Sequence, residues 1–472
     1  MHTRTHANLR NFARGHKSSA EYLDVAANAH GAEKGLLVKQ ALKRLRRARH
    51  HVVEVGPGGG SAVTYLAAQL TDDPALSRDT HLTLIEAPGV VSQSLTNAVE
   101  KFNHVGTCEV RNGFAQDVAS LLSDPVDVIS ASALLHEVYS YGGGYAGLHS
   151  MMRTLPSVLN PGGFFAYRDV YAVHGSSLHQ RVIHSYNSRA WLTFLRMFTP
   201  HYLGAGTHPY HHADDELVAR QDSRIVSVSD LDPATCAVIA APIGLFREIQ
   251  RHYITLRDHV WRSGVLGFTP VLDGMDGDLA TDWIDFRAGH KRIHYRLGEE
   301  TEWLSGPQRI MLAAMSEPYA GHHTIDGDIF DSVTDVALLA FLDAAEAGDT
   351  TCSQVWESWL LREGLESYAY LTLDQLLTAF TVHSAEADTD TVLMPVRTGD
   401  IHRVDRHYYN RFLTQRLANP LLDAKQLVLF QNIPRSDVDA LRQSFDTVSD
   451  RCAKASLARV YTAINKGDNW TP

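Results

Sequence analysis

The sequence has few cysteines, no long apolar run and fewer basic than acidic residues. Its four cysteines, Cys108, Cys236, Cys352 and Cys452, are far apart and form no Cys-x-x-Cys pair, which argues against a disulfide framework or a zinc site. No stretch is apolar for long enough to cross a bilayer, and the first residues contain no apolar signal core. We therefore expect a cytoplasmic protein with no membrane partner. A formal net charge of −11 also argues against a nucleic-acid partner.

What the sequence does have is a glycine-rich turn between two apolar segments. The β-branched run His51–Val55 predicts a buried strand, and it leads into the turn Gly56–Gly60. A predicted helix, Ser61–Leu70, follows, and a second strand, Leu82–Ile85, ends at the acid Glu86. Strand, glycine turn, helix, strand and acid in this order predict a βαβ nucleotide site. The glycines let a ligand approach the main chain, and the acid can accept hydrogen bonds from ribose hydroxyls.

The spacing of the glycines favours one kind of nucleotide. A dinucleotide fingerprint needs glycine at its first, third and sixth places, and here Ser61 occupies the sixth. The pattern is instead Glu54-x-Gly56-x-Gly58-x-Gly60, which resembles motif I of the class I S-adenosylmethionine (SAM)-dependent methyltransferases. The resemblance implies an α/β fold with a doubly wound, mostly parallel sheet, SAM as cofactor and S-adenosylhomocysteine (SAH) as product. The alternative is a glycine turn that binds nothing.

The resemblance also implies a set of cofactor contacts. The glycine turn would pass close to the amino-acid part of SAM, Glu54 would lie near its ammonium group, and Glu86 would bind the ribose. Where the family often has an acid for the adenine amino group, this chain has Phe114, which could only stack on the ring. Asn112, Gln116 or a backbone group would then supply the polar contact. The expected cofactor-binding residues are Glu54, Gly56, Pro57, Gly58, Gly60, Glu86, Ala87, Gly113, Phe114, Ala115 and Ser132.

The candidate catalytic residues follow the next predicted strand, Asp127–Ala131. Ligands of open parallel sheets bind beyond the carboxyl ends of the strands, so we expect His136, Glu137, Tyr139 and Tyr141 near the transferred methyl group. His136 is the best candidate for a base because its ordinary pKa lies near neutrality, although it could instead only pack beside the cofactor. Glu137 could orient His136, bind the acceptor or cap a helix, and the two tyrosines could bound the pocket.

The length of 472 residues predicts two or three domains, or one domain with a large insertion. The turn Asn160–Gly163 resembles the LxPGG signature of the same family, but the usual closing helix and two strands do not follow it. We expect them later: the helix at residues 371–380, one strand at 391–396 or 381–384, and the last strand at 425–430. The predicted parts are a helical cap (1–50), a SAM-binding core (51–174), an inserted, mainly helical lid or substrate domain (175–365) and a C-terminal part (366–472) that completes the sheet and adds a terminal helix.

Histidine-rich segments raise the question of a metal. His208–Glu216 and the pair His322-His323 carry imidazoles and carboxylates, but neither has an established ligand spacing, so we predict no metal site. The predicted function is SAM-dependent methyl transfer to a small or medium organic molecule, such as a secondary metabolite. The alternatives are a SAM-fold enzyme of non-methylating or cyclase-type chemistry and a non-catalytic binding protein. The inserted helices could support a homodimer, but no heptad pattern requires one.

Overall fold

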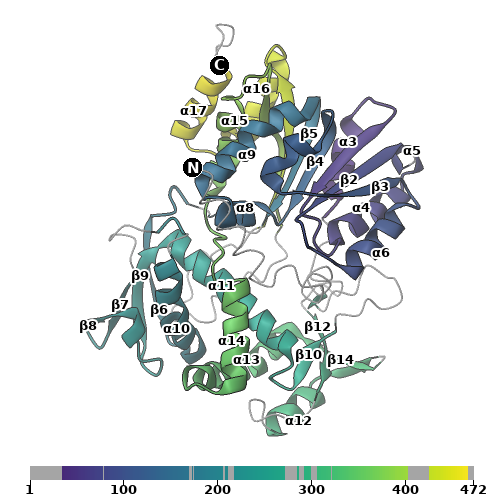
Figure 1. The fold of residues 1–472 in the computed structure, drawn as a ribbon. Coiled ribbons are helices and arrows are strands. Elements are labelled where there is room, and N and C mark those ends of the chain that lie inside the picture. Colours follow the sequence, from purple (N-terminus) through teal and green to yellow (C-terminus); the bar gives the residue numbers. More distant parts are fainter. Residues whose placement is uncertain are drawn as a thin grey trace.

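A seven-stranded sheet forms the centre of one half of the molecule (Figure 1). The computed structural model describes residues 34–77, 79–169, 173, 175–205, 208–210, 217–271, 284–285, 292–298, 306–319, 321–401 and 425–465. Its strands are β1 (His50–Val55), β2 (Thr80–Glu86), β3 (Thr107–Asn112), β4 (Val126–Ser132), β5 (Leu159–Asp169), β15 (Thr391–Ile401) and β16 (Lys425–Pro434). Their order is β3-β2-β1-β4-β5-β16-β15, and β16 runs in the direction opposite to the other six strands.

Helices cover both faces of this sheet because alternate residues of its buried strands face opposite sides. Val52 packs with one helical layer and Val53 with the other. The Val52 layer contains α3 (Leu36–Arg44), α4 (Ser61–Thr71) and α6 (Gln93–Phe102). The Val53 layer contains α7 (Val118–Leu121), α8 (Leu135–Tyr141), α9 (Tyr145–Val158), α15 (Leu373–Ser384) and α16 (Val438–Ser449). Helix α17 (Lys454–Ile464) packs on α15, and α5 (Pro74–Ser77) and the 3-10 turn η1 (Ala115–Asp117) lie in connections.

The prediction of a doubly wound, mostly parallel sheet is therefore confirmed. Helix α15 and strands β15 and β16 are the closing helix and two strands that were expected late in the chain. Strand β16 pairs directly with β5, so the C-terminal part completes the core sheet. Of the predicted N-terminal helix, only the part from residue 34 onward lies among the described residues.

In the residues that the structure describes, the segment between β5 and α15 combines helices with strands, and the mainly helical insertion stays a prediction. It holds helices α10 (Arg189–Ala205), α11 (Ile243–Ser263), α12 (Gly306–Ala314), α13 (Gly327–Glu346) and α14 (Thr350–Arg362) and the 3-10 turn η3 (Val228–Asp230). It also holds two sheets. One consists of β6 (Arg181–Tyr186), β9 (Ala237–Pro242), β7 (Val218–Gln221) and β8 (Arg224–Val226). The other consists of β10 (Phe268–Pro270), β11 (Ile284–Asp285), β12 (Arg292–Leu297), β13 (Glu317–Tyr319) and β14 (His322–Asp326).

The start of this segment shows how strand and helix alternate there. The chain forms β6 first and begins α10 only at Arg189. Strand β6 contains two neighbouring β-branched residues, and its alternate residues His184 and Tyr186 are buried while Ile183 is exposed. This two-residue period belongs to a half-buried strand, and the short apolar run concealed it.

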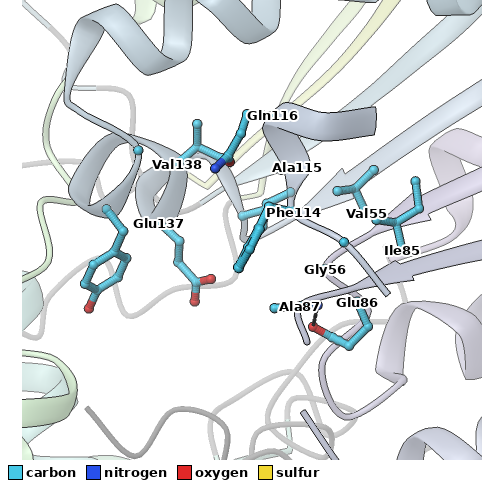
Figure 2. A pocket seen from close by; sticks show the side chains of 14 residues that line it. Val55, Gly56, Ile85, Glu86, Ala87, Phe114, Ala115, Gln116, Glu137 and Val138 are labelled. Carbon is cyan, nitrogen blue, oxygen red and sulfur yellow. Dashed lines mark hydrogen bonds between the residues drawn. The ribbon is translucent and has the colours of Figure 1, made fainter. Parts of the chain in front are cut away.

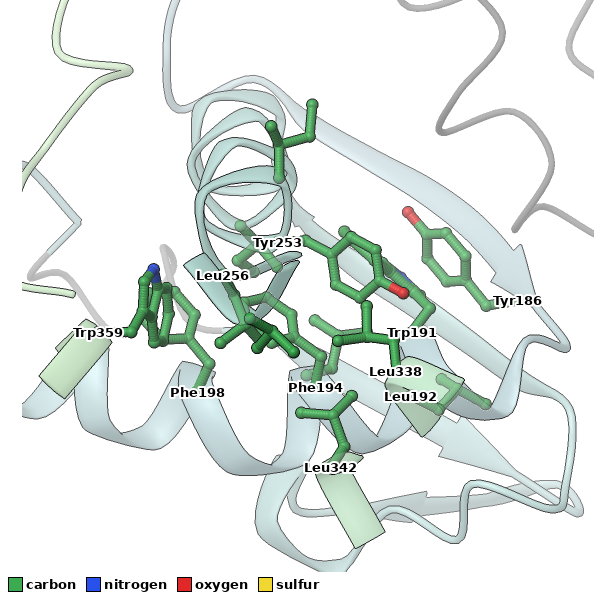
Figure 3. Close-up of a cluster of buried hydrophobic side chains, with 14 of the residues drawn as sticks. Tyr186, Trp191, Leu192, Phe194, Phe198, Tyr253, Leu256, Leu338, Leu342 and Trp359 are labelled. Atoms are coloured by element: carbon green, nitrogen blue, oxygen red, sulfur yellow. The ribbon is translucent and has the colours of Figure 1, made fainter. Parts of the chain in front are cut away.

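The inserted segment has a hydrophobic core of its own (Figure 3). Trp191, Phe194 and Phe198 follow one another on one side of α10, and Tyr253 of α11 meets the Trp191 and Phe194 rings edge-on. Trp359 of α14 closes the cluster, with its ring centroid 5.3 Å from that of Phe198. This core fixes the end of α14 and therefore the start of the buried segment, residues 363–372, that leads back to the central sheet.

Among the residues that the structure describes, no helix combines the length and the apolar composition that a membrane span requires.

Candidate active site

The glycine turn between β1 and α4 has a backbone that requires glycine. Gly56, Gly58 and Gly60 have φ angles of 68°, 53° and 78°, in the left-handed region that side chains disfavour. A Cβ on Gly56 would lie 2.8 Å from a methyl carbon of Leu134, and one on Gly60 would lie 2.7 Å from Cβ of Ala98. The turn is thus tight on its protein side, and larger residues would push it out of place.

The acid at the end of β2 is bonded to this turn. The backbone N–H of Gly58 donates to one carboxylate oxygen of Glu86 and that of Ala87 to the other, each over 2.7 Å (Figure 2 marks a bond of Glu86). Burial raises the pKa of Glu86 to about 7, against the effect of these two hydrogen bonds. Each oxygen keeps a further lone pair, so Glu86 can hold the turn and still accept a bond from a ligand.

The acid on β1 is also buried but is less well satisfied. Glu54 is 4% exposed, and burial raises its pKa to about 7, although a hydrogen bond with Ser130 opposes this. Its Oε1 atom has no hydrogen-bond partner among the described residues. A buried carboxylate oxygen without a donor is costly, so this position suits a cationic or hydrogen-bonding ligand group.

A cleft opens between the glycine turn and α8. Figure 2 shows Phe114 and Glu137 projecting into it from the side opposite Glu86 and Ala87. Its lining consists of Val55, Gly56, Ile85, Glu86, Ala87, Gly113, Phe114, Ala115, Gln116, Leu134, Glu137, Val138, Tyr141 and Gly142. Eight of the predicted site residues are brought together here: Gly56, Glu86, Ala87, Gly113, Phe114, Ala115, Glu137 and Tyr141. The others, Glu54, Pro57, Gly58, Gly60, Ser132, His136 and Tyr139, lie outside the lining.

Helix periodicity explains why Tyr139 does not reach the cleft. Glu137 and Tyr141 lie one turn apart on α8 and share a face, whereas Tyr139 lies roughly opposite them. Tyr139 is 3% exposed, and its ring stacks on that of Tyr370, with centroids 4.9 Å apart. Tyr139 therefore belongs to the core, and its expected place in the pocket wall is corrected.

His136, at the start of α8, is clamped by an acid at the end of β5. The Nδ1–H group donates to one oxygen of Asp169 over 2.8 Å, and the backbone N–H donates to the other over 3.1 Å. Burial alone would lower the pKa of His136, but the charge and hydrogen bond of Asp169, with Glu366 and Glu137 nearby, raise it to about 9. His136 is thus an imidazolium at neutral pH, and it must lose a proton before it can act as a base.

Glu366 is a site residue that sequence reasoning did not identify. Its Oε2 atom lies 3.7 Å from Nε2 of His136, and the hydroxyl of Tyr141 donates to its Oε1 atom over 3.2 Å. The side chain is fully buried. Glu366 lies on the connection from α14 to α15, where no local pattern distinguishes it from other acids. Only the fold brings it to α8.

The loop before α8 contains a strained residue. Ala133 has a φ angle of 58°, which costs an L-residue about 1 to 2 kcal/mol, and its N–H donates to the carbonyl of Arg168 over 2.7 Å. Strain of this kind gathers at functional sites because the surrounding structure must hold it. Here it sets the position from which α8, with His136 and Glu137, begins.

His208, His322 and His323, the described histidines of the two histidine-rich segments, do not line this cleft. His322 and His323 are neighbours on β14 and therefore face opposite sides of its sheet. His211, His212, the acids that follow them, the acidic loop at 273–282 and the aromatic stretch at 404–422 lie outside the described residues. In the part that is described, only His136, Glu137 and Glu366 bring potential metal-ligand atoms within 4.8 Å of one another. The absence of a metal stays a prediction.

The central sheet, the glycine turn and the acidic end of β2 together define the class I SAM-dependent methyltransferase fold. No family model and no curated protein matches the chain. Among solved structures, the chain is similar to the CurJ carbon methyltransferase (20% identity, TM-score 0.22, covering 29% of this chain and 33% of that one). It is also similar to a SAM-bound amino pentose methyltransferase from Micromonospora echinaspora (13%, 0.24, 34% and 60%) and to the trans-methyltransferase CalH in complex with SAH (18%, 0.24, 32% and 40%).

Each match therefore spans less than two thirds of the other chain and about a third of this one. Because the TM-scores are low, the function has to be argued from the geometry of the site itself.

Proposed function

We propose that this chain is a SAM-dependent methyltransferase that acts on a small or medium organic molecule. The observation that carries the proposal is the cleft into which the glycine turn, Glu86 and Phe114 open on one side and α8 opens on the other. A nucleotide site and a candidate acceptor site thus share one cavity.

The residues present fit SAM. The unpartnered Oε1 of Glu54 suits the ammonium group, and the close approach at Gly56 leaves main chain rather than side chain facing the ligand. Glu86 would accept hydrogen bonds from the ribose, and Phe114 would stack on the adenine with Gln116 nearby. When bound, the sulfonium supplies an already activated methyl group, so the protein's main task is to align the acceptor and exclude water.

The acceptor side would be formed by Glu137, Tyr141 and His136, with Glu366 behind them. Three carboxyl groups, those of Asp169, Glu137 and Glu366, surround one imidazole, which is where a proton from the acceptor could be received. We further propose that residues 175–365 form a lid or substrate domain between the core (51–174) and the C-terminal part (366–472), with a cap at 1–50. An insertion of this size favours a bulky or enclosed acceptor, such as a secondary metabolite.

Isothermal titration with SAM and with SAH tests the first step directly. We expect both to bind to one site per chain. Binding of neither compound would contradict the proposal and favour a non-catalytic protein.

Mass spectrometry of reactions with candidate acceptors tests the second step. A product heavier by one methyl group, formed together with SAH, supports methyl transfer. A product without the added methyl would favour the alternative of cyclase-type or other non-methylating chemistry.

A further inference from the structure

A row of buried groups leads away from the acceptor side of the site. Nε2 of His136 faces Oε2 of Glu366 at 3.7 Å, and the same oxygen lies 2.7 Å from the hydroxyl of Tyr368. That hydroxyl also forms a short hydrogen bond with Glu363. The row His136, Glu366, Tyr368 and Glu363 therefore leads to the C-terminal end of α14, and Tyr141, which lines the cleft and donates to Glu366, connects the row with the cleft.

The middle of this row contains fewer hydrogens than its contacts need. A phenol carries one hydrogen, so Tyr368 can donate to Glu363 or to Glu366 but not to both. The second contact is a hydrogen bond only if one of the two carboxyl groups is protonated and donates to the phenol oxygen. Two arrangements satisfy this condition: the proton lies on Glu366 in one and on Glu363 in the other. They interconvert when Tyr368 gives its own hydrogen to one carboxylate and takes the proton of the other carboxyl group in the same step.

Burial along the row shows where protons could enter and leave. Glu366 is 0% exposed and Tyr368 is 2% exposed, whereas His136 and Glu363, at the two ends, are each 6% exposed. Glu363 also lies beside Arg362, whose Nε is 3.5 Å from Oε1 of Glu363. The row is thus buried along its whole length, and its two ends have a slightly larger exposed fraction than its centre.

We propose that Glu366, Tyr368 and Glu363 form a proton relay that connects His136 with solvent during methyl transfer. This inference rests on the proposed function, because methyl transfer to an O–H, N–H or C–H acceptor releases one proton per turnover. Glu366, Tyr368 and Glu363 are then positioning and proton-carrying residues, and His136 is the residue that meets the acceptor.

The proton count closes over one cycle. Rotation of the Glu366 side chain shortens the 3.7 Å gap, and the imidazolium passes its Nε2 proton to Glu366. Once Glu363 has released its proton to solvent, Tyr368 gives its own hydrogen to Glu363 and takes the one on Glu366. Neutral His136 then accepts the acceptor's proton as the acceptor's electron pair bonds to the methyl carbon and the carbon–sulfur electrons remain on sulfur. The site returns to its starting charge, with one proton delivered to solvent.

The backbone around Tyr368 is held in place for this role. The N–H groups of Tyr368 and Ala369 both donate to Glu248, whose pKa is raised to about 8 by burial. The guanidinium of Arg251 lies over the Tyr368 ring, 5.2 Å from its centroid, in a cation–π contact. Burial also raises the pKa of Tyr368 well above 10, so the phenol passes protons on without becoming a phenolate.

The shared proton can be tested by infrared spectroscopy of the full chain without any ligand. The variants are Glu363→Gln, Glu366→Gln and the double variant, each compared with wild type at neutral pH. If the two carboxyl groups share one proton, each single variant loses the same protonated-carboxyl band and the double variant loses no more. Loss of no band, or loss of two separate bands that add in the double variant, would overturn the relay.

Transport can be tested by the exchange of the His136 imidazole Nε2 proton with solvent, followed by NMR on histidine-labelled protein. In Tyr368→Phe and Glu363→Gln we expect exchange to slow by about tenfold or more, since tenfold is only about 1.4 kcal/mol of barrier. The matched control is Tyr202→Phe, which removes the hydroxyl of another buried tyrosine that contacts Ser367 but lies off the row. Unchanged exchange in both test variants, or equal slowing in the control, would overturn the proposal.

Titration with SAH separates this proposal from the proposed function. If the protein binds SAH but the infrared spectra show no shared proton, the proposed function stands and the relay is refuted. If the shared proton is found but the protein binds neither SAH nor SAM, the proposed function is refuted.

Discussion

Replacing Asp169 by asparagine should destabilise the protein in a way that depends on pH. Asp169 is 1% exposed, and its charge and hydrogen bond to Nδ1 are what raise the pKa of His136 to about 9 against the effect of burial. A group whose folded pKa lies above its unfolded value stabilises the folded state when it is protonated. This contribution is complete below the unfolded pKa near 6.5 and is lost as the pH rises through about 9.

The magnitude follows from the two pKa values. Each pKa unit is worth about 1.4 kcal/mol, so the full contribution of His136 is on the order of 3 kcal/mol, and most of it remains at pH 7. The amide of the substituted side chain could still accept one hydrogen bond but carries no charge, so most of this amount should disappear. At pH 10 the imidazole of the wild type is neutral as well, and the pH-dependent part of the difference should vanish.

Urea unfolding at pH 7 and at pH 10 measures the difference in free energy of unfolding between wild type and Asp169→Asn at each pH. Asp127→Asn is a suitable control because Asp127 is also buried but pairs with Arg47, 3.0 Å away, which stays charged at both pH values. The cost of the control substitution should therefore change little with pH. If the Asp169→Asn difference in free energy of unfolding were the same at pH 7 and pH 10, the ion pair with His136 would not be the source of the stability.

Three further predictions concern the cofactor and the base. Gly58→Asp should abolish SAH binding in isothermal titration because it puts a charged side chain into the turn. The control Gly162→Asp changes a partly exposed glycine that also has a positive φ but has open space around it, and it should bind SAH normally. Normal binding by Gly58→Asp would mean that the pocket is misplaced. The affinity for SAM should rise between pH 6 and pH 8, because Glu54 and Glu86, with pKa values near 7, become carboxylates that attract a cation. An affinity for SAM that stays constant across this pH range would contradict their role. His136→Ala should lower turnover by about 100-fold or more, the scale of general-base catalysis, while changing the Kd for SAM little; an unchanged rate would remove its base role.

The half of the molecule built around the seven-stranded sheet could be predicted from sequence because its signals are local. The strand ending at Val55, the glycines with positive φ and the acid Glu86 fall within one short segment, and each residue type is required where it occurs. The closing strands were also identifiable because β16 is a continuous apolar run that suits a buried strand.

The remainder depended on tertiary contacts that a linear pattern does not contain. Glu366 reaches His136 only because the core of the insertion fixes the end of α14. No sequence pattern near residue 366 predicts that contact. Tyr139 was assigned to the pocket by its proximity in sequence, whereas the pitch of α8 turns it into the core. The short strands of the insertion were missed because a few β-branched residues are weak evidence beside long amphipathic helices.

The pairing of β16 with β5 has a consequence for how the chain is made. When β5 leaves the ribosome, its outer edge has unpaired N–H and C=O groups, and the strand that covers them is synthesised only after the whole insertion and β15. An open strand edge is a template for pairing with another chain. The long interval before Lys425–Pro434 emerges is therefore the period in which a nascent chain is most exposed to misassembly, and a gene truncated before that strand should yield aggregates instead of a shorter enzyme.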